Sequence, residues 1–230
     1  MACSMRKTSC IIIVLGVALL LLVGCTKVKE EYYSDGILRS RIEYRNGKEN
    51  GLATFYQPNG MRVSEIEMKD GKKNGSFRTF YSNGNIESEA TYQNDSLVGT
   101  QSFFDIDGAL VESVTYASGK KNGEYRVWHA RDLVQTIGYF KNDLWDGHWE
   151  YYDGRGFLVG EGDFDEGTGI LTNYNSQGMK HKITHYVHNK KEGDEVYYDA
   201  QGNEIKRITF KEDKILTVNG QRVERDSVND

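Results

Sequence analysis

Three histidines near the C-terminus are the residues best suited to metal chemistry, with the spacing His181-x-x-x-His185-x-x-His188. On a helix this spacing would place three imidazole ligands on one face. On a strand, at about 3.3 Å per residue, His181 and His185 would share a face about 13 Å apart, and His188 would point away or enter a turn. Zinc requires ligands about 2.0–2.1 Å from one point. Since the repeat described below assigns the segment to a strand, we expect no metal site.

Carboxylates are frequent, with 34 Asp and Glu against 29 Lys and Arg, and the net charge is −5. Pairs such as Glu65/Glu67 and Asp163/Asp165 alternate with other residues, as on the solvated face of a strand. Acid–base catalysis needs a water-poor pocket that shifts pKa values. No Ser/His/Asp set or phosphate-binding glycine loop accompanies them. The sequence therefore indicates a protein with no catalytic residues and no cofactor, and its acidity gives no reason to expect nucleic acid.

The first 24 residues have the features of a cleaved targeting segment. Arg6 and Lys7 precede an apolar run that is shorter than the roughly 20 residues a membrane span requires. A charged start followed by a short apolar stretch predicts a signal-peptide helix over residues 1–24.

The run ends in Leu22-Val23-Gly24-Cys25, which resembles the lipobox of bacterial lipoproteins. The resemblance implies that Cys25 carries the lipid and that the mature chain is a membrane-anchored lipoprotein of the bacterial cell envelope. We expect it at the outer membrane, on the periplasmic or the surface side. An ordinary signal peptide with an incidental Cys25 is the alternative. Residues 25–31 are interpreted as a lipidated tether.

Aromatic residues recur at a fixed interval through the rest of the chain. Two series and a glycine series keep this interval through one shared two-residue deletion, which indicates a repeat of 22–24 residues in about eight copies. The first series, the structural repeat ladder, is Tyr32, Tyr56, Phe80, Phe104, Trp128, Tyr152, Tyr174 and Tyr198. The second is Tyr44, Met68, Tyr92, Tyr116, Phe140, Phe164, Tyr186 and Phe210. The glycines are Gly51, Gly75, Gly99, Gly123, Gly147 and Gly193.

Each copy has the pattern of a β-hairpin. Pro58-Asn59-Gly60 suits a three-residue loop, because Pro presets φ and Gly supplies the left-handed residue. If Gln57 pairs with Met61, then Tyr56 faces Arg62 and Thr54 faces Ser64. This register predicts one apolar face that carries Tyr56, Ser64, Ile66 and Met68, and one charged face. Because a hairpin alone is marginal, neighbouring hairpins must stack their aromatic residues.

The repeat resembles the MORN repeat in its bacterial variant, found in YwqK-family antitoxins. The segment from Phe80-Tyr81-Ser82-Asn83-Gly84 through Glu89, Tyr92 and Gly99 carries the resemblance, with Asp70 to Gly75 as the inter-unit turn. It implies an all-β fold, an elongated, twisted antiparallel meander of hairpins over residues 32–217. Residues 218–230 are expected to form a polar C-terminal cap and tail. Asp132, Asp143 and the shortened turn at Glu166 to Gly169 are expected to bend the array.

Two surfaces are candidates for binding. The densest aromatic patch contains Trp145, Trp149, Tyr139 and Tyr151, and Trp145 is expected in a turn. Lysines recur in predicted turns, as at Lys72-Lys73 and Lys120-Lys121, where ordinary solvated turns are the interpretation we favour over contacts with anionic headgroups.

We therefore expect a lipid-anchored, non-catalytic binding or scaffold module whose partner is a protein or a glycan. The YwqK resemblance implies the alternative of an immunity or antitoxin-like neutraliser of a toxin.

Overall fold

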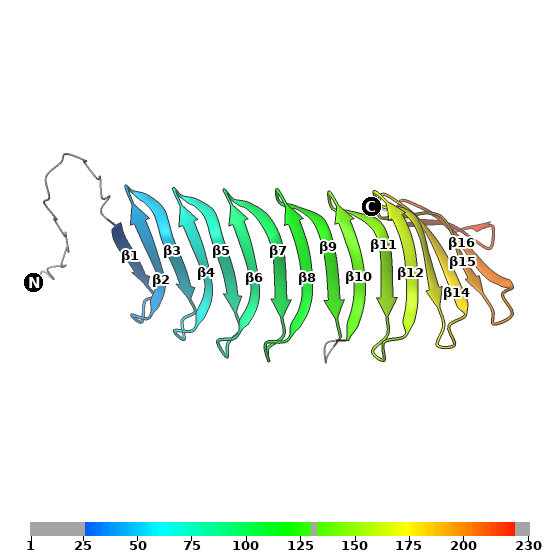
Figure 1. Cartoon of the computed structure of the whole chain (residues 1–230), viewed down its shortest axis with the longest axis horizontal. Helices are drawn as coiled ribbons and strands as arrows, with labels where there is room; N and C mark the ends of the chain where they lie inside the picture. The colour runs from blue at the N-terminus through cyan, green and yellow to red at the C-terminus, as the bar shows by residue number, and fades with distance from the viewer. Residues whose placement is uncertain (1–25, 130–132, 224–230) are drawn as a thin grey trace, which may run out of the picture.

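The computed structural model describes residues 26–129 and 133–223. The expected signal peptide, Cys25, Asp132 and the tail at 224–230 lie outside these ranges. The described residues form 18 antiparallel strands in one sheet, and each strand pairs with the next along the chain (Figure 1). This confirms the predicted all-β meander of hairpins. The strands are β1 (Thr26–Tyr32), β2 (Leu38–Arg45), β3 (Lys48–Tyr56), β4 (Arg62–Lys69), β5 (Lys72–Phe80), β6 (Ile86–Gln93), β7 (Ser96–Phe104), β8 (Leu110–Ala117), β9 (Lys120–Trp128), β10 (Val134–Lys141), β11 (Leu144–Tyr152), β12 (Leu158–Asp165), β13 (Thr168–Tyr174), β14 (Lys180–Val187), β15 (Lys190–Tyr198), β16 (Glu204–Lys211), β17 (Lys214–Val218) and β18 (Gln221–Arg222).

The boundaries differ from the expected segments at both ends. Thr26–Glu31, expected to be a tether, belong to β1, which pairs with β2 from Thr26↔Arg45 onward. At the other end, β17 and β18 form a short final hairpin around Asn219-Gly220, which crosses the expected boundary between the repeat and the cap at residue 218. The first strand therefore starts directly after Cys25.

The two ends of each strand are joined by different connections. At one end, two-residue turns such as Asp70-Gly71 have positive φ at both positions, 53° and 81°. This is the type I′ turn, whose twist matches that of the flanking strands. At the other end, the predicted loop is confirmed, since the Gln57 N–H donates to the Met61 carbonyl at 2.8 Å across Pro58-Asn59-Gly60.

A β-bulge next to this loop changes the predicted register by one residue. Tyr56 does pair with Arg62, but Phe55 pairs with Ser64, so the predicted pairing of Thr54 with Ser64 is wrong. Val63 is the extra residue. Because side chains alternate along a strand, Tyr56 points to the face opposite Ser64. The two aromatic series therefore lie on opposite faces of the sheet, and the expectation that Tyr56 shares a face with Ile66 is wrong.

We name the two faces by these series. The core face carries the second series and most of the buried apolar side chains. Its apolar side chains form rows of cross-strand neighbours, such as Ala53–Ile66–Phe77–Ala90. The ladder face carries the first series. Buried apolar residues of the core face are Ala53, Ile66, Ala90, Val114, Trp149, Phe164, Ile208 and Phe210.

The periodic glycines mark a second bulge in β3, β5, β7, β9, β11 and β15. In β3, residues 50–52 lie opposite the single residue Glu43, because Ile42 pairs with Ala53 and Tyr44 with Glu49. Gly51 has φ of 112°, which favours glycine. The shortened unit lacks this bulge: β12 and β13 pair one to one, with Phe164 opposite Gly169. The two-residue deletion thus removes the two extra residues of the bulge.

Successive type I′ turns are linked by hydrogen bonds of two kinds, which alternate from Gly71 to Gly167. Where the second turn residue is glycine, as in Gly71, only its N–H donates, here to the Glu49 carbonyl. Where it is aspartate, its carboxylate also accepts a bond. The Asp95 N–H donates to the Lys73 carbonyl, and Asp95 Oδ1 accepts the Lys73 N–H. Asp143 makes the same two bonds with Lys121, and Asp213 makes them with Lys191.

At the opposite loops, a tyrosine hydrogen bond to the next hairpin also recurs every two hairpins. The Tyr33 hydroxyl donates to the Tyr56 carbonyl, and the Tyr81 hydroxyl donates to the Phe104 carbonyl. Both bonds therefore reach from one loop to the strand of the next hairpin. The repeating structural module thus comprises two hairpins, or 48 residues.

The array is elongated and curved. From β1 to β12 the strands follow one another along the long axis at regular intervals, and the strands from β14 onward curve out of that line (Figure 1). Bulges increase strand twist, so the loss of one bulge in β13 is a physical reason for a change of direction near the place where the sequence predicted a bend.

Candidate functional site

The densest aromatic cluster lies on the core face between β9 and β14. Trp145 contacts the rings of Trp149, Phe164 and Tyr186, with centroids 5.1–5.5 Å apart. Phe140 packs edge-on against Trp149 at 5.1 Å. Burial is the main cause that raises the pKa of Tyr125, at the edge of this cluster, to about 12. The cluster therefore holds neighbouring hairpins together in the shortened region of the array.

The structure places Trp145, Trp149 and Tyr151 together on the core face and Tyr139 on the ladder face. Trp149 is only 2% exposed, and its indole Nε1 donates to the Tyr139 carbonyl at 3.1 Å. Gly138 accommodates the indole, since a Cβ there would lie 2.2 Å from the ring. Tyr139 is 47% exposed on the ladder face. Trp145 is not in a turn but is the second residue of β11, opposite Phe140. Only Trp145 and Tyr151 combine the core face with partial exposure, and their role in binding stays a prediction.

The structural repeat ladder forms a continuous surface on the ladder face. All eight of its side chains remain at least partly exposed, and each lies opposite the first residue of the following strand, as Phe80 lies opposite Ile86. Most of those opposing residues are aliphatic: Leu38, Ile86, Leu110, Val134 and Leu158. Neighbouring strands lie about 4.8 Å apart, so ladder rings recur about every 10 Å. An apolar strip therefore runs along the array.

Carboxylates line the strip. The row beside it on the ladder face contains Glu65, Glu89, Glu150 and Glu161. Glu150 and Glu161 are direct cross-strand neighbours, and the Tyr174 hydroxyl donates to Glu161 at 2.5 Å. The strip and these carboxylates together fit a ligand that is both apolar and cationic.

His148 is a ladder-face residue that the sequence reasoning missed. Its Nδ1 lies 2.8 Å from Asp163, and Glu150 and Glu161 lie 3.8 and 3.9 Å from its Nε2. The hydrogen bond with Asp163 is the main cause that raises the pKa of His148. A single histidine gives no spacing signal, and only the register brings these carboxylates around it.

The three histidines considered for metal binding are placed as the strand interpretation requires. His181 and His185 lie in β14, and His188 is the first residue of a type I′ turn with φ of 49°. His185 Nδ1 lies 2.7 Å from the Asp194 carbonyl. Within residues 26–129 and 133–223, no group of three or more His, Cys, Asp or Glu side chains is arranged to hold a metal ion.

The recurring lysines lie at strand starts rather than in turns. Lys73 is the second residue of β5, and its Nζ lies 5.0 Å from the centroid of the Tyr92 ring. Lys121 and Lys191 lie 4.9 and 4.8 Å from the Phe140 and Phe210 rings. These ammonium groups cover aromatic residues of the core face, which is a structural role for part of the basic series.

A buried ionic network occupies the core face near the C-terminus. Glu195 is 3% exposed; it accepts hydrogen bonds from Lys191 at 2.6 Å and from Thr184 at 3.0 Å. Burial alone would raise the pKa of Glu195, but the bonds from Lys191 and Tyr197 lower it overall. The carboxylate is therefore fully engaged in the structure.

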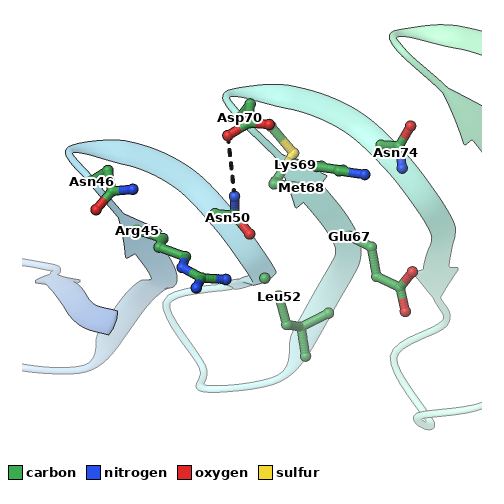
Figure 2. Close-up of a pocket in the computed structure, with 10 residues that line it drawn as sticks. Arg45, Asn46, Asn50, Leu52, Glu67, Met68, Lys69, Asp70 and Asn74 are labelled. Atoms are coloured by element: carbon green, nitrogen blue, oxygen red, sulfur yellow. Dashed lines mark hydrogen bonds between the residues drawn. The ribbon is translucent and has the colours of Figure 1, made fainter. Parts of the chain in front are cut away.

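A groove of about 630 Å³ lies between two neighbouring type I′ turns (Figure 2). Asn50 and Asp70, joined by a long hydrogen bond of 3.5 Å, and the side chains of Glu67 and Lys69 are among the groups that line it. Glu67 is committed to the backbone, since it accepts the Ser76 N–H at 3.1 Å. The groove is an open, polar consequence of the turn geometry and has no assembled acid–base pair.

The family comparison agrees with this geometry. A family described as a MORN repeat variant matches residues 27–46 and 73–94. The chain carries MORN-variant repeats. The first matched segment covers most of β1 and β2, and the second covers most of β5 and β6, so the MORN-variant unit corresponds to the hairpins described above. The match does not extend to the YwqK family.

Other comparisons add little to the MORN-variant assignment. No curated protein matches the chain. A crystal structure of TcdB2-TccC3-Cdc42 is 11% identical, with a TM-score of 0.24, and the match covers 81% of this chain and 15% of that one. A Tc holotoxin pore from Photorhabdus luminescens is 13% identical, with a TM-score of 0.21 and coverage of 86% and 14%. These matches are too weak in sequence and in structure to indicate a shared function. In the part of the chain that the structure describes, no helix is long and apolar enough to cross a membrane.

Proposed function

We propose that the chain is a lipid-anchored, non-catalytic binding or scaffold module of the bacterial cell envelope, with a protein or a glycan as partner. The observation that carries the proposal is the strip of half-exposed ladder residues, repeated in register along a sheet one layer thick. Each hairpin of such an array adds one similar patch, which suits recognition of an extended partner. The acidic balance of the chain speaks against nucleic acid.

Anchoring through Cys25 gives the array a definite starting point. Because β1 begins at Thr26, a lipid on Cys25 would hold the N-terminal edge of the sheet next to the bilayer. Two or more acyl chains suffice for stable attachment to a bilayer. The sheet would extend from there at the outer membrane, on the periplasmic or the surface side.

The test combines localisation with capture. The full chain and a Cys25→Ala variant are expressed, and the membrane and soluble fractions are compared; loss of the variant from the membrane is expected. Partners of the lipidated protein are then captured from solubilised membranes, together with a Phe104→Ser/Trp128→Ser variant that interrupts the strip. A partner retained equally by both proteins, or an unchanged membrane fraction for Cys25→Ala, would contradict the corresponding half of the proposal.

A further inference from the structure

One hairpin of the array shows how the ladder face holds a guanidinium group. The Arg62 guanidinium lies 3.9 Å from the centroid of the Phe80 ring and donates to Glu65 Oε1 at 2.6 Å. Arginine stacks on aromatic rings and pairs with carboxylates through its planar N–H groups. The ring and the carboxylate are thus a ready-made pair of contacts for arginine, supplied by two successive hairpins.

The same ring and carboxylate recur one unit later without the arginine. Phe104 and Glu89 correspond to Phe80 and Glu65, but Ile86 stands where Arg62 would be. A groove of about 390 Å³ is found here, lined by Ile86, Glu89, Phe104, and Asp107 among others. Asp107 adds a second carboxylate to the lining, so the groove combines an aromatic ring with two acidic groups.

The walls of this groove are held in place by hydrogen bonds between successive loops. The side-chain amides of Asn83 and Asn85 both donate to the Ile106 carbonyl, at 2.8 and 2.9 Å. The Tyr81 hydroxyl donates to the Phe104 carbonyl at 2.7 Å. A ligand therefore meets walls that are already ordered, which lowers the entropic cost of binding.

Glu89 is available for a ligand. Its nearest cation is the Arg78 guanidinium, with Nε 3.7 Å from Oε2, and both side chains are more than 40% exposed. Exposed pairs of this length contribute little. Elsewhere in the described units the combination is incomplete: the position of Glu89 is Arg41, Ser113, Ile137 or Ile183, and Glu161 is bonded to Tyr174.

We propose that the groove formed by Phe104, Glu89 and Asp107 binds an arginine side chain of a partner polypeptide. The inference rests on the proposed binding function and specifies the partner as a protein. The guanidinium plane stacks on Phe104, its N–H groups donate to the carboxylates, and the aliphatic stem packs on Ile86. Lysine, a compact and strongly hydrated point charge, makes only part of these contacts.

The test uses NMR titration of the full chain in detergent with N-acetyl-arginine amide, with N-acetyl-lysine amide as the comparison. Glu89→Gln is expected to weaken arginine binding about tenfold, since a charged hydrogen bond contributes about 1.5 kcal/mol or more. Asp165→Asn, an equal change of charge at an exposed position in β12, is the matched control. Equal binding of the lysine probe, or equal effects of the two variants, would overturn the proposal.

Two further variants exchange the features of neighbouring units. Ile86→Arg places a guanidinium over Phe104 from within the chain and is expected to abolish binding of the probe. Arg62→Ile exposes the Phe80–Glu65 pair and is expected to create a second site, so that the resonances of both units respond. Unchanged binding by Ile86→Arg would overturn the proposal. Partner capture that depends on the strip, with no response to arginine, would reject only this inference and leave the binding function standing.

Discussion

Asp95 and Lys73 are joined by two hydrogen bonds across neighbouring type I′ turns. The Asp95 N–H donates to the Lys73 carbonyl at 2.9 Å, and Asp95 Oδ1 accepts the Lys73 N–H at 2.8 Å. The same pair of bonds recurs at Asp143, two hairpins later, and at Asp213, three hairpins after that. The turns between them end in Gly119 and Gly167, which make a single bond, and in Asn189, whose Oδ1 accepts the Trp145 N–H. The paired turns therefore define which hairpins are fastened most firmly to each other.

We expect Asp95→Ala to lower the free energy of unfolding by about 1–2 kcal/mol more than Asn94→Ala does. Both residues have positive φ, 68° and 49°, so both variants introduce similar backbone strain, but only Asp95→Ala leaves the Lys73 N–H without its acceptor. Asp95→Asn should be nearly neutral, because Asn189 uses its Oδ1 in the same way toward the Trp145 N–H. Urea denaturation followed by circular dichroism measures all three, and equal losses for the two alanine variants would contradict this role.

A Gly75→Ala substitution is expected to be among the most destabilising changes to a surface residue. At Gly75, φ is 128°, and an added Cβ would lie 1.9 Å from Glu67 Oε2, whose carboxylate accepts the Ser76 N–H. Gly99→Ala is the control, since it has φ of 68° and nothing within 4 Å of the added Cβ. Gly99→Ala should cost about 1–2 kcal/mol from the left-handed backbone alone, and Gly75→Ala should cost clearly more. Similar unfolding midpoints would show that Glu67 moves aside freely.

Trp149→Ala should destabilise the protein by about 3–5 kcal/mol, as large truncations of buried aromatic residues do. Trp145→Ala is expected to cost less because its side chain is partly exposed, although it loses contacts with Phe164 and Tyr186. Thermal unfolding of both variants separates the two roles. A smaller loss for Trp149→Ala than for Trp145→Ala would contradict the assignment of Trp149 to the core.

His148 should make stability depend on pH near neutrality. Its pKa is raised in the folded state, mainly by the hydrogen bond with Asp163, so protonated His148 favours folding. The contribution is fully present below the unfolded pKa, near 6.5, and is lost as the pH rises through the higher folded value. The urea midpoint should fall between pH 6 and pH 8 in the wild type and change less in His148→Gln. A parallel pH profile for the two proteins would exclude His148 as the source.

The hairpin pitch, the loop chemistry and the number of units could be predicted because each depends on local residue types, such as Pro58-Asn59-Gly60 and the spaced aromatic residues. The register beyond the loop could not. The extra residue Val63 has no distinctive side chain, and one bulge is enough to move Tyr56 to the opposite face. Gly51 and its equivalents marked the repeat interval in the sequence, but their periodicity did not show that they lie in a second bulge.

The candidate surfaces were harder to predict for the same reason. Trp145 lies opposite Phe140 and Trp149 opposite Gly162, which places both on the core face, while Tyr139 lies opposite Asp146 on the ladder face. The groove at Phe104 could be recognised only by comparing equivalent units, because Ile86 leaves the ring uncovered at the position where Arg62 covers Phe80 one unit earlier. Residue types alone do not show which carboxylate the register places next to which ring.

In the described part of the chain, the sheet ends in β1 and β18, each of which pairs with one strand only, so the stability of each hairpin depends on its immediate neighbours. Since each strand pairs only with its sequence neighbours, fraying at one end need not disturb hairpins farther along, and heating should release the array progressively rather than in a single cooperative step. A protease cut near the C-terminus would then shorten the protein while leaving the arginine groove at β6–β7 functional. Loss of length and loss of recognition would be separate events.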